Sequence, residues 1–207
     1  MLTDKDVAPR AGLLRECRAA FDWWQRLASS RTGVVLMFGW AVAEATVWPI
    51  IPDFLLAPMA AANRRRFYVP LAASILGAAA GGILLFLFAL YAPDGAYRVL
   101  RHVPMIHESQ IAAAHRELVA RGAAGYFVQP WSGIPFKVWA VVGGALGLSP
   151  WRAIPAFVLG RGLRMALWAI AARLLSGRFA RFVRDFSLFL AAIYAAVFFY
   201  GWWQVTG

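Results

Sequence analysis

The sequence predicts an all-α integral membrane protein, from its composition, its long apolar stretches and the prolines that interrupt them. Of 207 residues, 61% are hydrophobic and only 15% are charged, and the mean hydropathy is +0.61. Soluble domains are less apolar and carry more charge. The net charge of +11 comes from basic residues that flank apolar stretches and do not gather among stacking aromatics, which argues against a nucleic-acid partner.

Residues 1–32 predict an N-terminal amphipathic leader on the cytoplasmic side. Its mixed acidic and basic residues, without an early apolar core, are not typical of a cleavable signal peptide. Two interpretations of the helix stay open, namely a helix lying on an anionic membrane surface and a helix packing on its own membrane domain. The apolar residues at helical spacing are Leu13, Leu14, Cys17, Ala20, Phe21, Trp24 and Leu27.

Residues 33–207 predict a single membrane domain with three spans, at 67–91, 150–172 and 186–203. Each supplies close to the roughly 20 apolar residues that cross a bilayer. The second of these spans contains Arg161 and Arg164. Cys17 is the only cysteine, which excludes an internal disulfide.

Two further apolar stretches, 33–62 and 126–149, are broken by prolines and predict re-entrant hairpins. Pro49 and Pro52 interrupt the first, and Pro130 and Pro135 interrupt the second. Arginines at positions 26, 31 and 64–66 flank the first stretch on both sides, so the positive-inside rule has it enter and leave on the cytoplasmic side. The second stretch then enters from the opposite side, after an outer amphipathic loop at 92–125.

Each half of the membrane domain therefore contains a broken hairpin followed by a glycine-bearing span, and the halves face opposite leaflets. Inverted repeats with broken helices are a recurring plan of secondary transporters. The competing interpretation is that proline and glycine are simply common in membrane helices.

Glu44 and Asp53 are the candidate proton- or ion-coupling residues, because ionisable groups at membrane depth are costly and usually functional. Burial raises the pKa of a carboxyl group and a neighbouring arginine lowers it. Either acid can therefore exchange a proton as an anionic ligand binds and leaves. A structural alternative is a permanent ion pair, either Asp53–Arg161 or Glu44–Arg164. Asp53 can also be a helix-start residue that satisfies free backbone N–H groups.

The candidate substrate-binding residues are Lys137, Arg161, Arg164, Gln129 and Ser132. Lys137 follows the second break, where it can meet a phosphate as a point charge at a helix N-terminus. Arg161 and Arg164 lie about one turn apart and share a helix face. For Gln129 and Ser132, local satisfaction of the broken backbone is an equally good interpretation.

The outer loop contains His102, His107 and His115, whose spacing does not place all three on one helical face. We expect neither a metal site nor a cofactor, and we expect a solvated or interfacial helix at 104–121. No nucleophile–base pair or phosphate-binding glycine loop is evident, so an enzyme is not predicted.

The acid-proline motif Glu44-x4-Pro49-x2-Pro52-Asp53 resembles the DedA/VTT (SNARE-associated Golgi protein) superfamily, in particular its small YqaA-like branch. The stretch from Leu100 to Gly125 and the broken segment leading to Lys137 and Gly143-Gly144 add to the resemblance, which covers roughly 33–176. It implies two re-entrant hairpins that face each other and the movement of phospholipids or undecaprenyl phosphate, by scrambling or linked to protons. The family's two acids fall on Glu44 and Asp53. Its two arginines in the second hairpin have no clean counterpart, because the nearby positions are Gln129 and Lys137.

The sequence thus predicts a lipid flippase or scramblase in a bacterial-type plasma (inner) membrane. The expected partners are membrane lipids with anionic headgroups, and protons are a possible coupling ion. The sequence leaves open whether the protein forms a homo-oligomer. The alternatives are a proton-coupled exchanger of a small solute or ion, which would use the same acids in a closed cavity, and a purely structural membrane protein.

Overall fold

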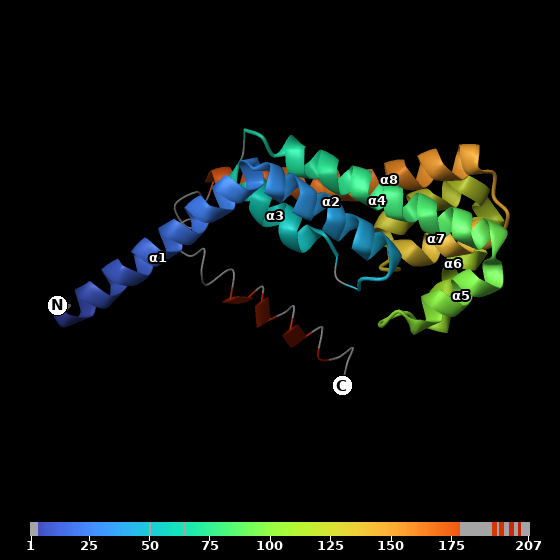
Figure 1. Ribbon diagram of the computed structural model, residues 1–207, viewed down its shortest axis with the longest axis horizontal. Helices are drawn as coiled ribbons and strands as arrows, with labels where there is room; N and C mark the ends of the chain where they lie inside the picture. The colour runs from blue at the N-terminus through green and yellow to red at the C-terminus, as the bar shows by residue number, and fades with distance from the viewer. Residues whose placement is uncertain are drawn as a thin grey trace.

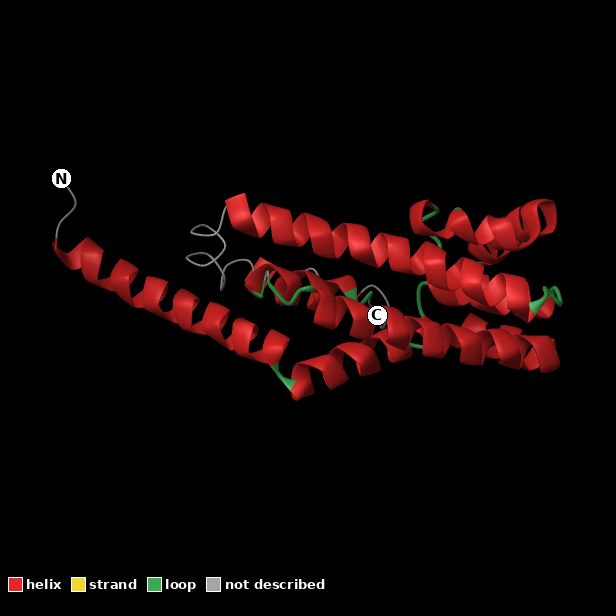
Figure 2. Cartoon of the chain, turned by 90° about the horizontal axis from the view of Figure 1, so that it is seen from above, coloured by secondary structure: helices red, strands yellow, loops and turns green. Residues whose placement is uncertain are grey.

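The computed structural model describes residues 4–49, 51–63 and 65–178, and isolated positions beyond them. Every regular element in these ranges is helical (Figures 1 and 2). The predicted span at 186–203 lies outside the continuously described residues. Two of the described helices, α4 (Tyr68–Tyr91) and α8 (Pro150–Arg178), contain windows long and apolar enough to cross a membrane. The predicted bounds of 67–91 and 150–172 therefore matched closely, although α8 continues to Arg178.

The leader forms α1 (Asp4–Ser29), an arm that extends away from the bundle for most of its length (Figure 1). Toward its end the helix joins the core, where Ala28 is fully buried and Trp24 packs on a cluster that includes Leu56 and Met165. Cys17, earlier in α1, is also buried. Packing on the membrane domain, one of the two interpretations above, therefore applies to the end of this helix.

The first broken stretch forms a helical hairpin of α2 (Arg31–Thr46) and α3 (Asp53–Ala62). Ser30 caps α2 by accepting a hydrogen bond from the Gly33 N–H at 3.0 Å. The helix ends before Pro49 because a residue preceding proline disfavours helical geometry, and α3 begins directly after Pro52. A hydrogen bond from Asn63 to the Ser29 hydroxyl joins the two open ends, so the chain returns to the end of the molecule at which it started.

Helices α2 and α4 pack closely through small residues. A Cβ atom on Gly77 would lie 2.4 Å from the Phe38 carbonyl oxygen, and one on Gly81 would lie 2.8 Å from the Val42 carbonyl oxygen. Both glycines therefore allow backbones to approach, as in membrane helix pairs. Large apolar side chains remain exposed along the outer faces of α4 and α8, which suits hydrocarbon better than water; they include Leu76, Leu84, Leu159, Leu163 and Leu174.

The outer segment folds into α5 (Pro93–His102) and α6 (Glu108–Arg121), so the single helix predicted at 104–121 is wrong at its start. Met105 has a φ of 66°, a left-handed conformation that cannot continue a helix, and α6 begins three residues later. Ile111 and Leu118 are buried in the core, so α6 packs on the bundle with one face.

The second broken stretch differs from the first. Its entering arm consists of two short 3₁₀ segments, η1 (Gly122–Phe127) and η2 (Gln129–Trp131), and only its second arm, α7 (Phe136–Ala145), is an α-helix. Helix α7 is buried from Phe136 to Gly144. A Cβ atom on Gly144 would lie 2.2 Å from the Phe86 carbonyl oxygen, which shows how closely α7 packs against α4.

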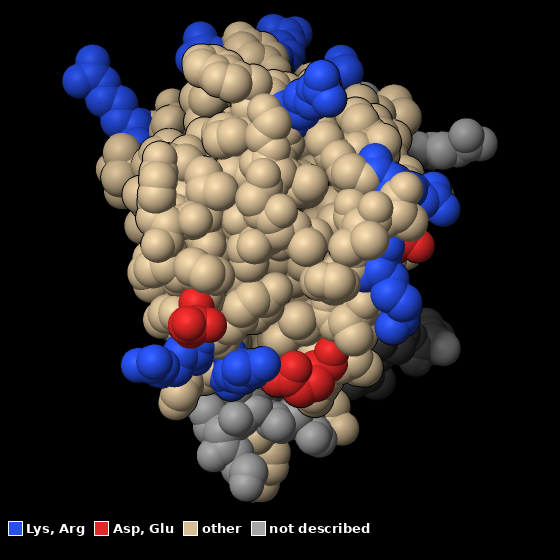
Figure 3. All heavy atoms as spheres, turned by 90° about the vertical axis from the view of Figure 1, so that its right-hand side faces the viewer, with Lys and Arg blue, Asp and Glu red and all other residues tan. Residues whose placement is uncertain are grey.

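The two ends of the bundle carry different charge. At the end with α5 and α6, basic and acidic side chains lie around a face whose middle is uncharged (Figure 3). At the opposite end, the Arg173 guanidinium lies 4.8 Å from the centre of the Phe67 ring, which places the end of α8 beside the start of α4. Arg31, Arg65 and Arg66 are exposed near this second end.

Candidate functional site

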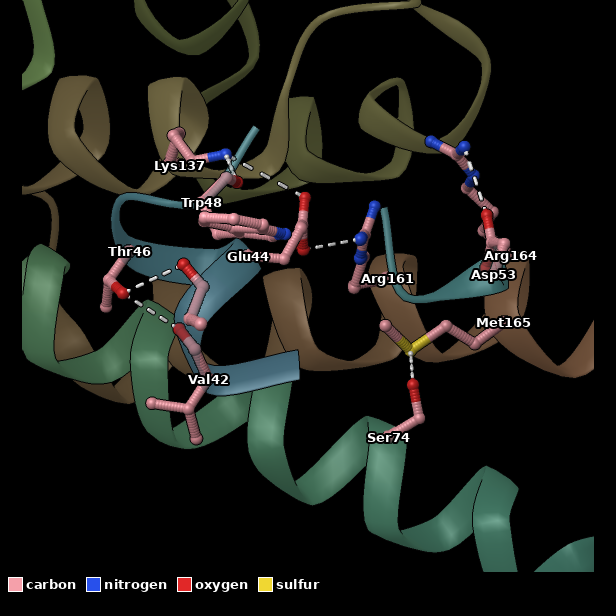
Figure 4. Close-up of polar contacts among 11 residues, drawn as sticks. Val42, Glu44, Thr46, Trp48, Asp53, Ser74, Lys137, Arg161, Arg164 and Met165 are labelled. Carbon is pink, nitrogen blue, oxygen red and sulfur yellow. Dashed lines mark hydrogen bonds and ion pairs between the residues drawn. The ribbon is translucent and has the colours of Figure 1, made fainter. Parts of the chain in front are cut away.

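Five charged residues converge inside the bundle, where the α2–α3 break meets the start of α7 and the middle of α8 (Figure 4). Glu44, Asp53, Lys137 and Arg161 are buried, and Arg164 is partly buried. The sequence singled out all five of them as candidates. The structure brings acids and arginines together that lie more than 100 residues apart, since Arg161 follows Glu44 by 117 positions.

Glu44 lies between two cations. Its Oε2 accepts a hydrogen bond from Arg161 Nη2 at 2.7 Å, and its Oε1 lies 4.0 Å from Lys137 Nζ. Glu44 and Arg161 are only 1% and 3% exposed. The Arg161 guanidinium also lies 5.5 Å from the centre of the Phe136 ring, a cation–π geometry.

Asp53 and Arg164 form a second and looser pair. Arg164 Nη2 lies 3.3 Å from Asp53 Oδ2, and the two side chains are 22% and 10% exposed. This pair is therefore the part of the site that lies closest to the outside of the protein.

The pairing is the reverse of the structural alternative considered from the sequence, which joined Asp53 to Arg161 or Glu44 to Arg164. Helix α3 packs along α8, and both run toward the end where Asn63 meets Ser29 and Arg173 meets Phe67. Asp53, at the start of α3, therefore meets Arg164. Glu44, which precedes the break, meets Arg161 one turn earlier on α8.

Lys137 connects the two breaks. Its Nζ donates a hydrogen bond to the Trp48 carbonyl oxygen at 3.0 Å, and Trp48 lies between the end of α2 and Pro49. Lys137 thus binds the backbone at the point where α2 has ended. The sequence predicted a phosphate-binding role for Lys137 but not this contact, for which the helix break at Pro49 was the available signal.

Gln129 and Ser132, the other two candidates from the sequence, are not part of these ion pairs. Ser132 Oγ donates to the Gln129 carbonyl oxygen at 3.0 Å and accepts from the Ile134 N–H at 3.2 Å, which is local satisfaction of a turn. The Gln129 side chain is buried in η2, which packs on α8, and among the described residues its amide atoms have no hydrogen-bond partner.

The cluster holds two carboxylates and three basic groups, so its formal charge favours an anion as a further ligand. Buried ion pairs contribute little net stability, which makes a functional reason for this cluster more attractive. Within the part of the chain that the structure describes, no three His, Cys, Asp or Glu side chains gather to hold a metal ion. No protein-family model, curated protein or solved structure matches this chain.

Proposed function

We propose that this protein moves lipids with anionic, phosphate-bearing headgroups across a bilayer, as a flippase or scramblase. The observation that carries the proposal is the buried cluster of Glu44, Asp53, Lys137, Arg161 and Arg164 in an otherwise apolar helical bundle. Ionisable groups at membrane depth mark substrate and ion pathways far more often than they serve as supports.

In this proposal, the headgroup enters at the looser pair. A phosphate competes with Asp53 for Arg164, and the excess positive charge of the cluster then accommodates it. The headgroup would advance toward Arg161 and Lys137, while its acyl chains stay in the surrounding hydrocarbon. Asp53 or Glu44, released from its arginine, would take up a proton, which supplies a way to couple lipid movement to a proton gradient.

The membrane arrangement that we propose has three crossings and two re-entrant segments that enter from opposite leaflets. The α2–α3 hairpin, which returns to its starting end, supports the first re-entrant segment. The arginines near that end favour the cytoplasmic side of a bacterial-type inner membrane for it and for the N-terminus. The inverted repeat and the membership in the DedA/VTT superfamily are part of the same proposal.

One observation favours a proton-coupled exchanger of a small solute or ion as a second candidate. Glu44 and Arg161 are almost completely enclosed by protein, as in an occluded cavity, and a lipid headgroup would have to open this enclosure.

The test measures transbilayer movement of fluorescent phospholipids and of an isoprenyl phosphate in proteoliposomes, with and without a pH gradient. The variants are Asp53→Asn and Arg164→Gln. Arg121→Gln is the matched control, because Arg121 also forms an ion pair, with Glu117 at 2.9 Å, but on the exposed surface of α6.

We expect each site variant to slow lipid movement by about tenfold or more, the scale of one lost charge-assisted hydrogen bond, and the control to leave it unchanged. Dependence on the pH gradient would establish proton coupling. If folded wild-type protein moved no lipid, the proposal would be wrong, and uptake of small anions into the same vesicles would then test the exchanger.

A further inference from the structure

A shallow apolar groove lies between α2 and α4, away from the buried charge cluster. It encloses about 500 Å³, within the range of ligand-binding pockets. The side chains that line it are all apolar or aromatic: Val34, Val35, Phe38, Tyr68, Val69, Ala72, Ala73 and Leu76. Apart from the Tyr68 hydroxyl, the lining side chains offer no hydrogen-bond partner, so the groove suits a hydrocarbon chain.

The groove stops where the two helices make their closest contact. Gly77, which follows Leu76, touches the Phe38 backbone, and Gly81 touches Val42 one turn further along. The groove therefore has a closed inner end at this contact and an open end toward the start of both helices.

The open end of the groove points to exposed arginines. Arg31 is the first residue of α2, and Arg65 and Arg66 precede α4. The two segments are held together there, because the Asn63 side chain donates to the Ser29 hydroxyl and accepts a hydrogen bond from the Arg66 N–H at 3.1 Å.

No acidic residue lies close to these three arginines in the sequence. Residues 23–43 and 54–93, which include the end of α1 and nearly all of α2, α3 and α4, contain no aspartate or glutamate. Among the described residues, none of these three arginines forms an ion pair with a carboxylate. The open end of the groove therefore attracts an anion.

The distance from the arginines to the far end of the groove matches the length of a phospholipid. At 1.5 Å per helical residue, Phe38 lies about 10 Å along α2 from Arg31, and Leu76 lies about 12 Å along α4 from Tyr68, its first residue. Tyr68 stands at the rim between arginines and groove, where an amphipathic ring suits the level of lipid headgroups.

We propose that this groove holds one anionic phospholipid, with its phosphate on Arg31, Arg65 and Arg66 and an acyl chain against Phe38 and Leu76. Basic sites beside membrane helices bind anionic headgroups in this way. None of the groove residues belongs to the charge cluster, so this lipid site is separate from that cluster. It would fill the space between α2, which carries Glu44, and α4, and the inference does not depend on lipid transport.

The test uses native mass spectrometry of the full-length protein in detergent, titrated with phosphatidylglycerol or with phosphatidylcholine of the same acyl chains. The headgroup variant is Arg65→Gln with Arg66→Gln. Its matched control is Arg116→Gln with Arg121→Gln, which removes the same charge from the exposed face of α6. The groove variant is Ala72→Trp, since Ala72 is exposed and lines the groove, so the larger ring fills it without entering the core.

We expect wild type and the control to bind one phosphatidylglycerol about tenfold or more tightly than phosphatidylcholine. The headgroup variant should lose this preference, and Ala72→Trp should lose the bound lipid. Equal binding of both lipids by wild type, or a preference that survives in the arginine variant, would overturn the inference. So would phosphatidylglycerol binding that survives Ala72→Trp, or its displacement by millimolar inorganic phosphate, because the anion alone would then account for binding.

Discussion

The two acid–arginine pairs of the site differ in enclosure, although their arginines lie one turn apart on α8. Glu44 and Arg161 meet at 2.7 Å and are shut off from solvent, with Lys137 as a second cation. Asp53 and Arg164 meet at 3.3 Å and keep part of their surface exposed. Charges that stay partly hydrated interact weakly, whereas fully buried ones depend on their partners. We therefore expect the first pair to stabilise the fold, whereas the second pair is the one that a ligand can reach more easily from outside.

The largest expected effect comes from breaking the enclosed pair. Arg161→Gln leaves Glu44 buried with only a distant lysine, and we expect a loss of about 3–5 kcal/mol in the free energy of unfolding. Arg164→Gln should cost less than this, because its contact with Asp53 is longer and Arg164 itself is partly exposed. Denaturant unfolding in detergent micelles measures both.

The double variant Glu44→Gln with Arg161→Gln separates pairing from packing. Removing both charges should recover most of the loss seen in Arg161→Gln, because no uncompensated charge remains. Equal losses from Arg161→Gln and Arg164→Gln would show that the two pairs do not differ in the way described above.

Lys137→Met tests whether the second cation supports the enclosed pair or the break. The variant removes the donor to the Trp48 carbonyl oxygen, and losing one hydrogen bond from a charged group costs about 1.5–3 kcal/mol. Amide hydrogen exchange should quicken at Val47 and Trp48 and stay unchanged in the middle of α4. Unchanged exchange at the break would mean that Lys137 acts only through Glu44.

Gly81→Ala should disturb the enclosed pair from a distance. The added Cβ would meet the Val42 carbonyl oxygen and the Ala45 side chain, and so would displace the turn of α2 that carries Glu44. Overpacking of this kind costs about 1–3 kcal/mol. In thermal unfolding, its effect should be less than additive with Arg161→Gln and additive with Arg164→Gln.

Gly39→Ala is the control for that experiment. Gly39 lies on the exposed face of α2, and nothing lies within 4 Å of an added Cβ, so the helix should gain about 0.5–1 kcal/mol. A comparable loss in both glycine variants would point to a general intolerance of α2 and not to the Glu44 pair.

The smallest expected effect is that of Asp53→Asn on stability. The amide is similar in shape to the carboxylate and can still accept from Arg164, which stays partly hydrated, so unfolding should change by about 1 kcal/mol or less. A loss as large as that of Arg161→Gln would give Asp53 a mainly structural role. A small loss would allow the effect of this variant on transport to be interpreted directly.

The long helices could be predicted closely because one local signal determines each of them. An uninterrupted apolar run ends at Tyr91, and Pro150 occupies the first turn of α8, where its missing N–H costs little. The helices between residues 92 and 125 were harder to predict, because the turn at Met105 depends on how α5 and α6 pack on the core. The second broken stretch was harder still, since prolines indicate where helix stops but not that 3₁₀ turns replace it.

The members of the charge cluster could also be predicted, because charged residues in apolar stretches are few. Their pairing could not. Which arginine meets Asp53 depends on the direction in which α3 packs along α8, and helix spacing within α8 carries no information about that direction. Gln129 illustrates a further limit, because its burial follows from the packing of η2 against α8 and not from its neighbours in sequence.

The separation of 117 residues between Glu44 and Arg161 also has a consequence for how the chain is made. The first hairpin is synthesised long before α8, so Glu44 and Asp53 precede Arg161 and Arg164, the arginines with which they pair. Each arm of the hairpin is shorter than a full crossing, which favours a delay at the membrane surface or within the insertion machinery until α8 emerges. Translation of α8 would then complete the assembly, with its two arginines drawing the earlier hairpin into place.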